Sequence, residues 1–255
     1  MSMTERVARL RQQSLEAVPT VSTERAELMT AFYQQRTDLV SAPLHRAQAF
    51  QYLMEHKTIY IGADELIVGE KGPAPKATPT YPELCCHSLA DLDILNCREK
   101  ISFAVSPQTR QVYEDQIIPF WRGRSMRDLV FHQMTGAWQA AYDAGVFTEF
   151  MEQRSPGHTV LDDKIYQRGM LDFQGEIARA LEQLDYLRDP EAYAKEQQLR
   201  AMDIVAGALI RFAERHAQQA RTLAAEEPDA QRRAELERMA AVCSWVPAHA
   251  PRDLW

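Results

Sequence analysis

The stretch between residues 147 and 160 places apolar and titratable side chains together around a predicted turn. It reads Phe-Thr-Glu-Phe-Met-Glu-Gln-Arg-Ser-Pro-Gly-His-Thr-Val, which combines two phenylalanines, two glutamates, an arginine and a histidine. Pro156 fixes φ at about −65° and Gly157 tolerates a positive φ, so a tight turn is predicted with His158 just after it. Such a mixture is typical of a substrate pocket, where His158 could exchange a proton near neutral pH. The alternative is a structural histidine, because a histidine after a Pro-Gly turn is commonly a surface or hydrogen-bonded residue.

A second group of chemically active residues is Cys85-Cys86-His87, and the chain has two further cysteines, Cys97 and Cys243. The Cys-Cys-His run could bind a metal or take part in redox chemistry. However, adjacent cysteines are poorly spaced for a structural zinc site, and the sequence contains no Cys-x-x-Cys pair. We therefore predict no metal site. Four cysteines fit a reducing cytoplasm, which is where we expect the protein.

Length and composition indicate an ordinary globular chain of 255 residues, 45% apolar and 25% charged. A net charge of −7 and the lack of a long basic run argue against a nucleic-acid partner. No apolar run reaches the length of about 18 residues that a membrane span needs, and residues 1–6 lack the apolar core of a secretion signal. The 10 glycines form no GxGxxG or P-loop pattern, which argues against a nucleotide-binding fold.

The elements that would position these groups are predicted to be mainly helical, with a small β element. A proline at Pro119 should end the helix that begins at Ser106-Pro107, and Phe120-Trp121 should pack inward. The other helices of the first half are expected over residues 4–17, after Ser22-Thr23, after Ser41-Ala-Pro43, over residues 125–133 and over residues 138–143.

The β element is expected within residues 58–69. Thr58–Ile61 and Leu66–Gly69 are rich in β-branched residues and are separated by Gly62-Ala-Asp64, which predicts a hairpin or two short strands. Residues 72–82 contain repeated prolines, which disfavour helix in the residue before each of them. This passage should therefore wrap over the body of the protein in an extended form.

Residues 166–243 are almost wholly helical in pattern. Breaks at Asp189-Pro190 and Pro228-Asp229 predict three helices that pack as antiparallel neighbours. Within them an apolar stripe repeats at three and four residues, and we interpret it as scaffold. The stripe consists of Met202, Val205, Leu209, Phe212 and His216.

Several stretches together resemble the glycyl radical enzymes, the pyruvate formate-lyase-like superfamily. The likeness runs along the whole chain but covers only the N-terminal third of such an enzyme, without most of its central α/β barrel. Within residues 1–255 it implies a partial domain with a wrap over 1–165, a helical bundle over 166–243 and a truncated lead into the barrel over 244–255, with a helix beginning at Arg252. The stretches are Ser22–Ala26, Asp64–Glu70, Thr80–His87, Ile117–Trp121, Phe147–Val160 and Pro247–Pro251.

Within the superfamily, the 147–160 stretch is most similar to the trans-4-hydroxy-L-proline dehydratases. The resemblance implies an anaerobic lyase in which a backbone glycyl radical, installed by a radical SAM activating enzyme, generates a cysteine thiyl radical that starts the elimination of water. It also implies that His158 hydrogen-bonds the substrate near its hydroxyl group and that Phe150 lines the pocket. We expect no cofactor to be bound by these 255 residues themselves.

The sequence also departs from the family pattern. The family's thiyl cysteine lies in a Cys-x-Glu motif; Cys97-Arg98-Glu99 has this spacing but falls far upstream of the reactive loop. The C-terminal glycyl radical motif is absent, so we assign no catalytic residue and expect the chain alone to be inactive. Two alternatives remain open: another branch of the superfamily (diol dehydratase, arylacetate decarboxylase or hydrocarbon-succinate synthase), or a non-enzymatic remnant that docks to a partner. A C-terminal partner chain or a homodimer would complete the protein.

Overall fold

The computed structural model describes residues 4–35, 40–147 and 161–253. Its α-helices are α1 (Glu5–Glu16), α2 (Glu24–Gln35), α3 (Ala42–His56), α4 (Leu89–Cys97), α5 (Pro107–Val112), α6 (Ile118–Trp121), α7 (Met126–Gln133), α8 (Gly136–Asp143), α9 (Met170–Glu182), α10 (Ala192–Glu226) and α11 (Ala230–Trp245). A π-helical turn, η1 (Tyr113–Ile117), joins α5 to α6, and a 3-10 turn, η2 (Asp162–Tyr166), precedes α9. Two short strands, β1 (Thr20–Ser22) and β2 (Ala77–Pro79), pair in parallel. The prediction of a mainly helical fold with a small β element is confirmed.

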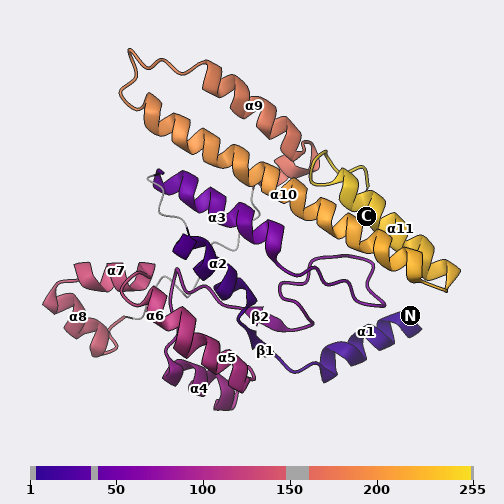
Figure 1. Ribbon diagram of the computed structural model, residues 1–255, viewed down its shortest axis with the longest axis horizontal. Helices are drawn as coiled ribbons and strands as arrows, with labels where there is room; N and C mark the ends of the chain where they lie inside the picture. Colours follow the sequence, from indigo (N-terminus) through magenta and orange to yellow (C-terminus); the bar gives the residue numbers. More distant parts are fainter. Residues whose placement is uncertain (1–3, 36–39, 148–160, 254–255) are drawn as a thin grey trace.

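The long helix α10 is the axis on which the other large helices pack. Helices α3, α9 and α11 all lie against it. Helix α9 runs along the N-terminal part of α10, and α11 runs along its C-terminal part (Figure 1). Three helices are observed as predicted: α10 begins just after the Asp189-Pro190 break, and α10 and α11 flank the Pro228-Asp229 break, although α9 already ends at Glu182. The division of the whole chain into a wrap, a bundle and a lead into a barrel stays a prediction.

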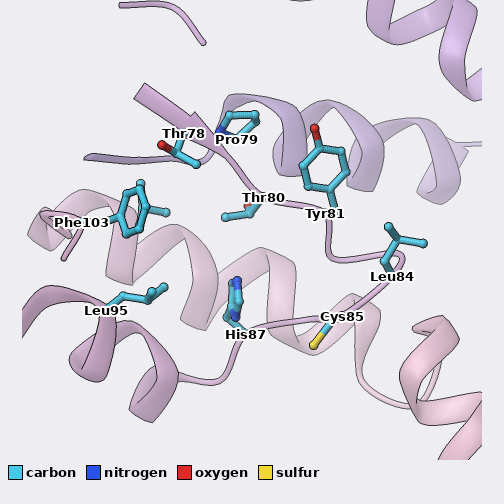
Figure 2. A pocket seen from close by; sticks show the side chains of 10 residues that line it. Thr78, Pro79, Thr80, Tyr81, Leu84, Cys85, His87, Leu95 and Phe103 are labelled. Carbon is cyan, nitrogen blue, oxygen red and sulfur yellow. The ribbon is translucent and has the colours of Figure 1, made fainter. Parts of the chain in front are cut away.

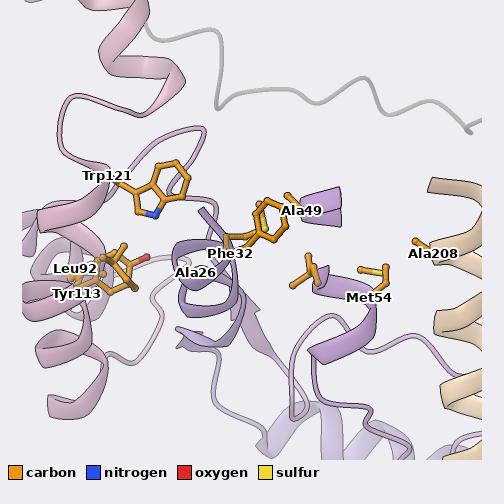
Figure 3. Close-up of a cluster of buried hydrophobic side chains, with 11 residues drawn as sticks. Ala26, Phe32, Ala49, Met54, Leu92, Tyr113, Trp121 and Ala208 are labelled. Carbon is orange, nitrogen blue, oxygen red and sulfur yellow. The ribbon is translucent and has the colours of Figure 1, made fainter. Parts of the chain in front are cut away.

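The main core lies between α2, α3, α4 and the η1–α6 segment. Figure 3 shows it extending from Leu92 and Tyr113 on one side to Ala208 of α10 on the other. Tyr113, Leu92 and Ile117 are fully buried. A second cluster joins α10 to α11 mainly through alanines, whose small side chains let the two helices approach closely. His216, the last residue of the predicted stripe, is buried, and its Nδ1 donates a hydrogen bond to the Phe212 carbonyl at 2.9 Å.

Most helices begin where the sequence provides a side-chain cap. Ser106 and Ser125 accept hydrogen bonds from the third residue of α5 and α7, as expected from their positions before those helices. Helix α4 was not among the predicted helices. Its signal in the sequence is the capping box of Ser88 and Asp91, in which each side chain bonds the other's backbone N–H.

The prediction of strands within residues 58–69 is wrong, because these residues form turns and irregular backbone. Two of their carbonyls accept hydrogen bonds from a side chain rather than from a neighbouring strand: Arg232 donates to Gly62 and Glu65, at 2.9 and 2.7 Å. The observed strands lie elsewhere, with Thr20 opposite Ala77 and a further bridge from Thr20 to Ala104. β-Branched residues therefore did not mark a sheet here, and none of the residues in Thr58–Ile61 and Leu66–Gly69 is fully buried.

The prediction that Pro119 ends its helix is also wrong, because the helix continues to Trp121. The chain widens into the η1 turn just before the proline, and the Ile118 N–H donates to the Tyr113 carbonyl five residues back. A proline lacks an N–H and its ring clashes with the carbonyl four residues earlier, and a π-turn relieves both problems. Trp121 is buried as predicted, whereas Phe120 is half-buried.

At the C-terminal side, Arg252 and Asp253 form a bend, so the helix expected to begin at Arg252 does not start there. The Arg252 guanidinium instead lies 3.4 Å from the centre of the Trp245 ring. None of the helices in the described part of the chain is long and apolar enough to cross a membrane.

Substitution of Thr30 tests the core. The Thr30 hydroxyl donates to the Ala26 carbonyl and accepts from the buried Trp121 indole N–H at 2.9 Å. Thr30→Val leaves that N–H without a partner, so we expect the free energy of unfolding to fall by about 1–3 kcal/mol in urea titrations. Thr222→Val is the matched control, because Thr222 makes the same bond to a carbonyl four residues back but is exposed. Equal effects of the two substitutions would contradict this assignment.

Candidate functional site

Phe150 and His158, the two predicted substrate-binding residues, lie outside the described residues. The structure does describe both flanks of their stretch, at Phe147 and Leu161. The flanks show how the fold holds the candidate site, while the substrate contacts of the two residues stay predictions.

The upstream flank is held by aromatic rings on α7 and α8. Phe147 packs edge-on against Trp138 of α8, with ring centres 5.2 Å apart, and lies 5.9 Å from the ring of Tyr142. Tyr142 in turn packs at a right angle on Phe131 of α7, at 4.8 Å. Edge-to-face pairs of this kind each stabilise by about 0.5–1.5 kcal/mol beyond the burial of their area. The predicted short helices over residues 125–133 and 138–143 therefore anchor one end of the stretch.

The downstream flank enters η2 through a left-handed turn. Leu161 and Asp162 have φ values of 67° and 53°, a backbone conformation that is uncommon for residues other than glycine. The turn directs Leu161 and Ile165 into an apolar groove beside α10. Arg168 then pairs with Glu176 at 2.6 Å and lies over the Phe173 ring, which joins the flank to α9.

The first turn of α9 is fastened to residues 247–249. The N–H groups of Met170 and Leu171 donate to the carbonyls of Pro247 and Ala248, at 2.8 and 3.1 Å, which satisfies donors that a helix start leaves free. Gly169 makes this approach possible. A Cβ on Gly169 would lie 2.2 Å from the Ala248 carbonyl oxygen and 2.3 Å from the His249 Cα, far inside contact distance. The flank of the candidate site and the Pro247–Pro251 stretch are thus held as one unit.

Gly169→Ala should separate this junction, since the atoms that a Cβ would meet belong to the backbone and cannot rotate away. We expect a loss of about 1–3 kcal/mol in the free energy of unfolding, measured by urea titration. Faster proteolysis within residues 161–170 should accompany it. Gly136→Ala is the control, because a Cβ there meets nothing within 4 Å. A variant at Gly169 as stable as that control would show that the junction tolerates a side chain.

A pocket of about 490 Å³ lies beside β2. Figure 2 shows Phe103 and Leu95 on one side of it and Leu84 and Cys85 on the other. Its floor includes Thr80, whose hydroxyl accepts from the buried Tyr113 hydroxyl at 2.6 Å. Burial raises the pKa of Tyr113 well above its usual range, so this phenol stays protonated and serves as a structural donor.

An arginine on α2 holds the segment that forms this pocket. Arg25 makes a two-pronged ion pair with Glu83, and its guanidinium lies 3.8 Å from the centre of the Tyr81 ring. It also donates to the Thr80 carbonyl at 3.1 Å. Both charged side chains are largely buried, with relative exposures of 16% and 19%. Removal of Arg25 or Glu83 would leave the other charge buried without a partner, which is costly. The ion pair therefore holds the segment that contains Thr80 and Glu83 against α2.

The Cys85-Cys86-His87 run belongs to this packed segment. Within residues 4–35, 40–147 and 161–253, no group of three or more His, Cys, Asp or Glu side chains could hold a metal ion. Cys86 packs against the main core, and burial raises the pKa of its thiol to about 11, with a smaller contribution from Asp128. A thiol in this state is a poor metal ligand and a poor nucleophile at neutral pH.

Cys97 provides the one Cys-x-Glu spacing in the sequence, but its surroundings do not suit radical chemistry. It is the last residue of α4 and is exposed, and Glu99 is exposed as well. A reactive radical needs a site from which water is excluded. The exposed position of Cys97 does not provide such a site.

Thiol labelling tests these assignments. At pH 8 a thiol with a pKa of about 11 is ionised in only about one molecule in a thousand, so Cys86 should react far more slowly than exposed Cys97. Its rate should rise with pH until the thiol ionises. Mass spectrometry of the modified peptides gives both rates, and Cys97→Ser serves as the control. Rapid modification of Cys86 in the folded chain would contradict the assignment.

The family model for pyruvate formate lyase-like proteins matches residues 3–255. The chain belongs to this family. The trans-4-hydroxy-L-proline dehydratase of Clostridioides difficile is 46% identical over 247 residues, which cover 97% of this chain and 31% of that protein. A crystal structure of hydroxyproline dehydratase from Clostridioides difficile, with trans-4-hydroxy-L-proline bound, matches with a TM-score of 0.92 and 45% identity over 98% of this chain and 32% of the other.

Two other solved structures match less closely. The glycerol-bound B12-independent glycerol dehydratase from Clostridium butyricum has a TM-score of 0.86 and 29% identity over 99% of this chain and 32% of its own. A glycyl radical enzyme from Archaeoglobus fulgidus has a TM-score of 0.84 and 28% identity, over 97% of this chain and 32% of that protein. The chain therefore spans about a third of the length of the relatives that it matches.

Two features that organise the surroundings of the candidate site were not predicted from the sequence: the Arg25–Glu83 ion pair and the close backbone approach at Gly169. Arg25 and Glu83 both lie in stretches that carried the resemblance, Ser22–Ala26 and Thr80–His87, but their pairing has no signal in one sequence. Gly169 stands just before a predicted helix, where its identity alone does not reveal the backbone that crosses it.

Proposed function

We propose that this chain is the N-terminal part of an anaerobic glycyl radical lyase that removes water from trans-4-hydroxy-L-proline or a similar hydroxylated substrate. The observation that carries the proposal is the difference in identity among relatives of one fold. The hydroxyproline dehydratase structure shares 45% of its aligned residues, whereas the glycerol dehydratase shares 29%. A cytoplasmic location is part of the proposal.

In this proposal the 147–160 stretch forms one wall of the substrate pocket. His158 donates or accepts a hydrogen bond at the substrate hydroxyl that leaves as water, because an imidazole can hold or release a proton near neutral pH. Phe150 lines the same wall and excludes water from a reactive intermediate. The anchored flanks at Phe147 and Leu161 support this role, since a binding wall must be held by rigid elements on both sides.

The radical chemistry itself is proposed to come from residues beyond these 255. A glycyl radical would supply the unpaired electron that begins hydrogen abstraction, and an activating enzyme would install it. The residues of this chain fit substrate binding rather than storage of the radical. The only Cys-x-Glu spacing in the sequence is the exposed Cys97-Arg98-Glu99, and the glycyl radical motif is absent from the sequence.

A second candidate function is a non-enzymatic subunit that docks to a complete enzyme or to a C-terminal partner chain. The same lack of a suitably placed Cys-x-Glu motif favours it. The two functions differ in whether residues that complete the barrel work together with this chain. The DNA that follows the Trp255 codon distinguishes them directly, by whether its frame encodes the Cys-x-Glu and glycyl motifs.

The chain alone should show no hydroxyproline turnover under strict anaerobiosis, even with an activating enzyme and S-adenosylmethionine. Electron paramagnetic resonance should detect no glycyl doublet after activation, because the sequence lacks the residue that stores the radical in this family. A doublet, or turnover by these 255 residues, would show that the assignment of roles is wrong.

The role of His158 is tested in a fusion in which this chain replaces the matching N-terminal third of the Clostridioides difficile dehydratase. If the imidazole positions the leaving hydroxyl, His158→Ala should lower kcat by about 10²–10³-fold, as the loss of one positioned donor does in other enzymes. His132→Ala is the control, because His132 is exposed on α7. Equal turnover by the two variants would remove His158 from the proposed site.

A further inference from the structure

An apolar groove of about 790 Å³ runs along α10, between α3 and α9. We call it the α10 groove. Its walls include Phe50 of α3, Phe173 and Ile177 of α9, and Met202, Val205 and Leu209 of α10. The last three are members of the predicted stripe, so three of its five residues line this groove while its end, His216, is buried.

The α10 groove is built like a protein interior but remains open. Apart from Arg46 and Gln198, its lining is apolar, and Met202 is 49% exposed. Apolar patches of this kind on soluble proteins mark surfaces that another element covers. Figure 1 shows α3 and α9 running along opposite sides of α10.

The relatives indicate what covers the groove. Proteins with the same fold over this region continue for about twice its length again, because the matched part is 31–32% of each relative. The groove is also bordered by Leu161 and Ile165, which directly follow the 147–160 stretch. An element seated in the groove would therefore also contact the flank of the proposed substrate wall.

The single charge in the groove adds a requirement for the occupant. Arg46 lies in the lining and forms no ion pair with any residue that the structure describes. A guanidinium at the edge of an apolar groove favours an occupant with a carboxylate at that position. A second copy of this chain suits it less well, because both copies carry a net charge of −7.

We propose that the α10 groove seats an apolar segment, with an acidic residue opposite Arg46, from the remaining two-thirds of the pyruvate formate lyase-like protein. The segment completes the core that α3, α9 and α10 leave open. It also holds the Leu161 flank in place. The proposal rests on family membership and groove chemistry, so it stands or falls separately from the choice of substrate.

Cysteine labelling measures whether the groove is filled. Met202→Cys places a thiol in the groove, and Arg200→Cys is the control on the same helix, because residues two apart on a helix face nearly opposite directions. Side-chain exposure at Arg200 is 57%. Each variant is prepared in the 255-residue chain and in the fusion with the Clostridioides difficile dehydratase. The rate at which a maleimide modifies the introduced thiol is then measured by peptide mass spectrometry.

We expect the thiol at position 202 to react readily in the chain alone and at least about tenfold more slowly in the fusion, where reaction requires local opening. The thiol at position 200 should react at similar rates in both. Arg46→Glu should raise the rate at position 202 in the fusion but not in the chain alone, because it would oppose the proposed carboxylate.

Three results would overturn the proposal. Equal labelling at position 202 in the chain and the fusion would show that the added two-thirds leaves the groove open. Protection in the chain alone that grows with protein concentration would assign the groove to a second copy. Protection in the chain alone at every concentration would show that these 255 residues cover the groove themselves.

Discussion

The fold depends on guanidinium groups that satisfy the backbone of a long irregular segment. Between α3 and α4 the only regular element is the three-residue strand β2, so most carbonyls there have no ladder partner. Helices supply the missing donors. Arg215 of α10 donates to the Met54 and Lys57 carbonyls at 2.5 and 2.7 Å, and Arg232 of α11 binds the next turn. Arg25 completes the set at Thr80. Because a guanidinium offers five donors in a rigid fork, three arginines can fix a segment that forms no sheet.

Several of the described stretches that carried the family resemblance contribute contacts that hold the fold together. Asp64 pairs with Arg9 of α1 at 2.6 Å, Glu83 pairs with Arg25, and Trp121 bonds Thr30 inside the core. Each contact joins residues far apart in the sequence and leaves little freedom of residue type. A family can therefore be identified from such stretches without reference to its catalytic residues. Activity, in contrast, depends on residues whose identity the scaffold does not constrain.

The helices could be predicted because their signals are local. Caps at Ser106 and Ser125, and proline-marked breaks beside α10, place helix ends within a few residues on the sequence alone. The strands could not, because β1 and β2 pair across more than fifty intervening residues and are too short to show alternation. Thr58–Ile61 shows the opposite error, since its strand-like composition stands in a half-buried irregular segment with no described strand beside it. The substrate wall could be proposed only through resemblance, because Phe150 and His158 have no spacing that defines their chemistry.

A consequence for mechanism follows from where the proposed wall is anchored. Its downstream flank is fastened to α9 and to Pro247–Ala248, and Leu161 also lines the α10 groove. If the remaining polypeptide fills that groove, association of the two parts and alignment of His158 become one event. A charged substitution at Val205, which touches no substrate in this proposal, would then lower kcat through misplacement of the wall, since small displacements of positioning groups are costly. Val205→Ile keeps the site apolar and should preserve kcat, whereas Val205→Asp should lower it, and the loss should appear together with faster labelling of a thiol at position 202. A loss of kcat while the thiol at position 202 stays protected would show that filling of the α10 groove does not align His158. Other contacts would then align the wall.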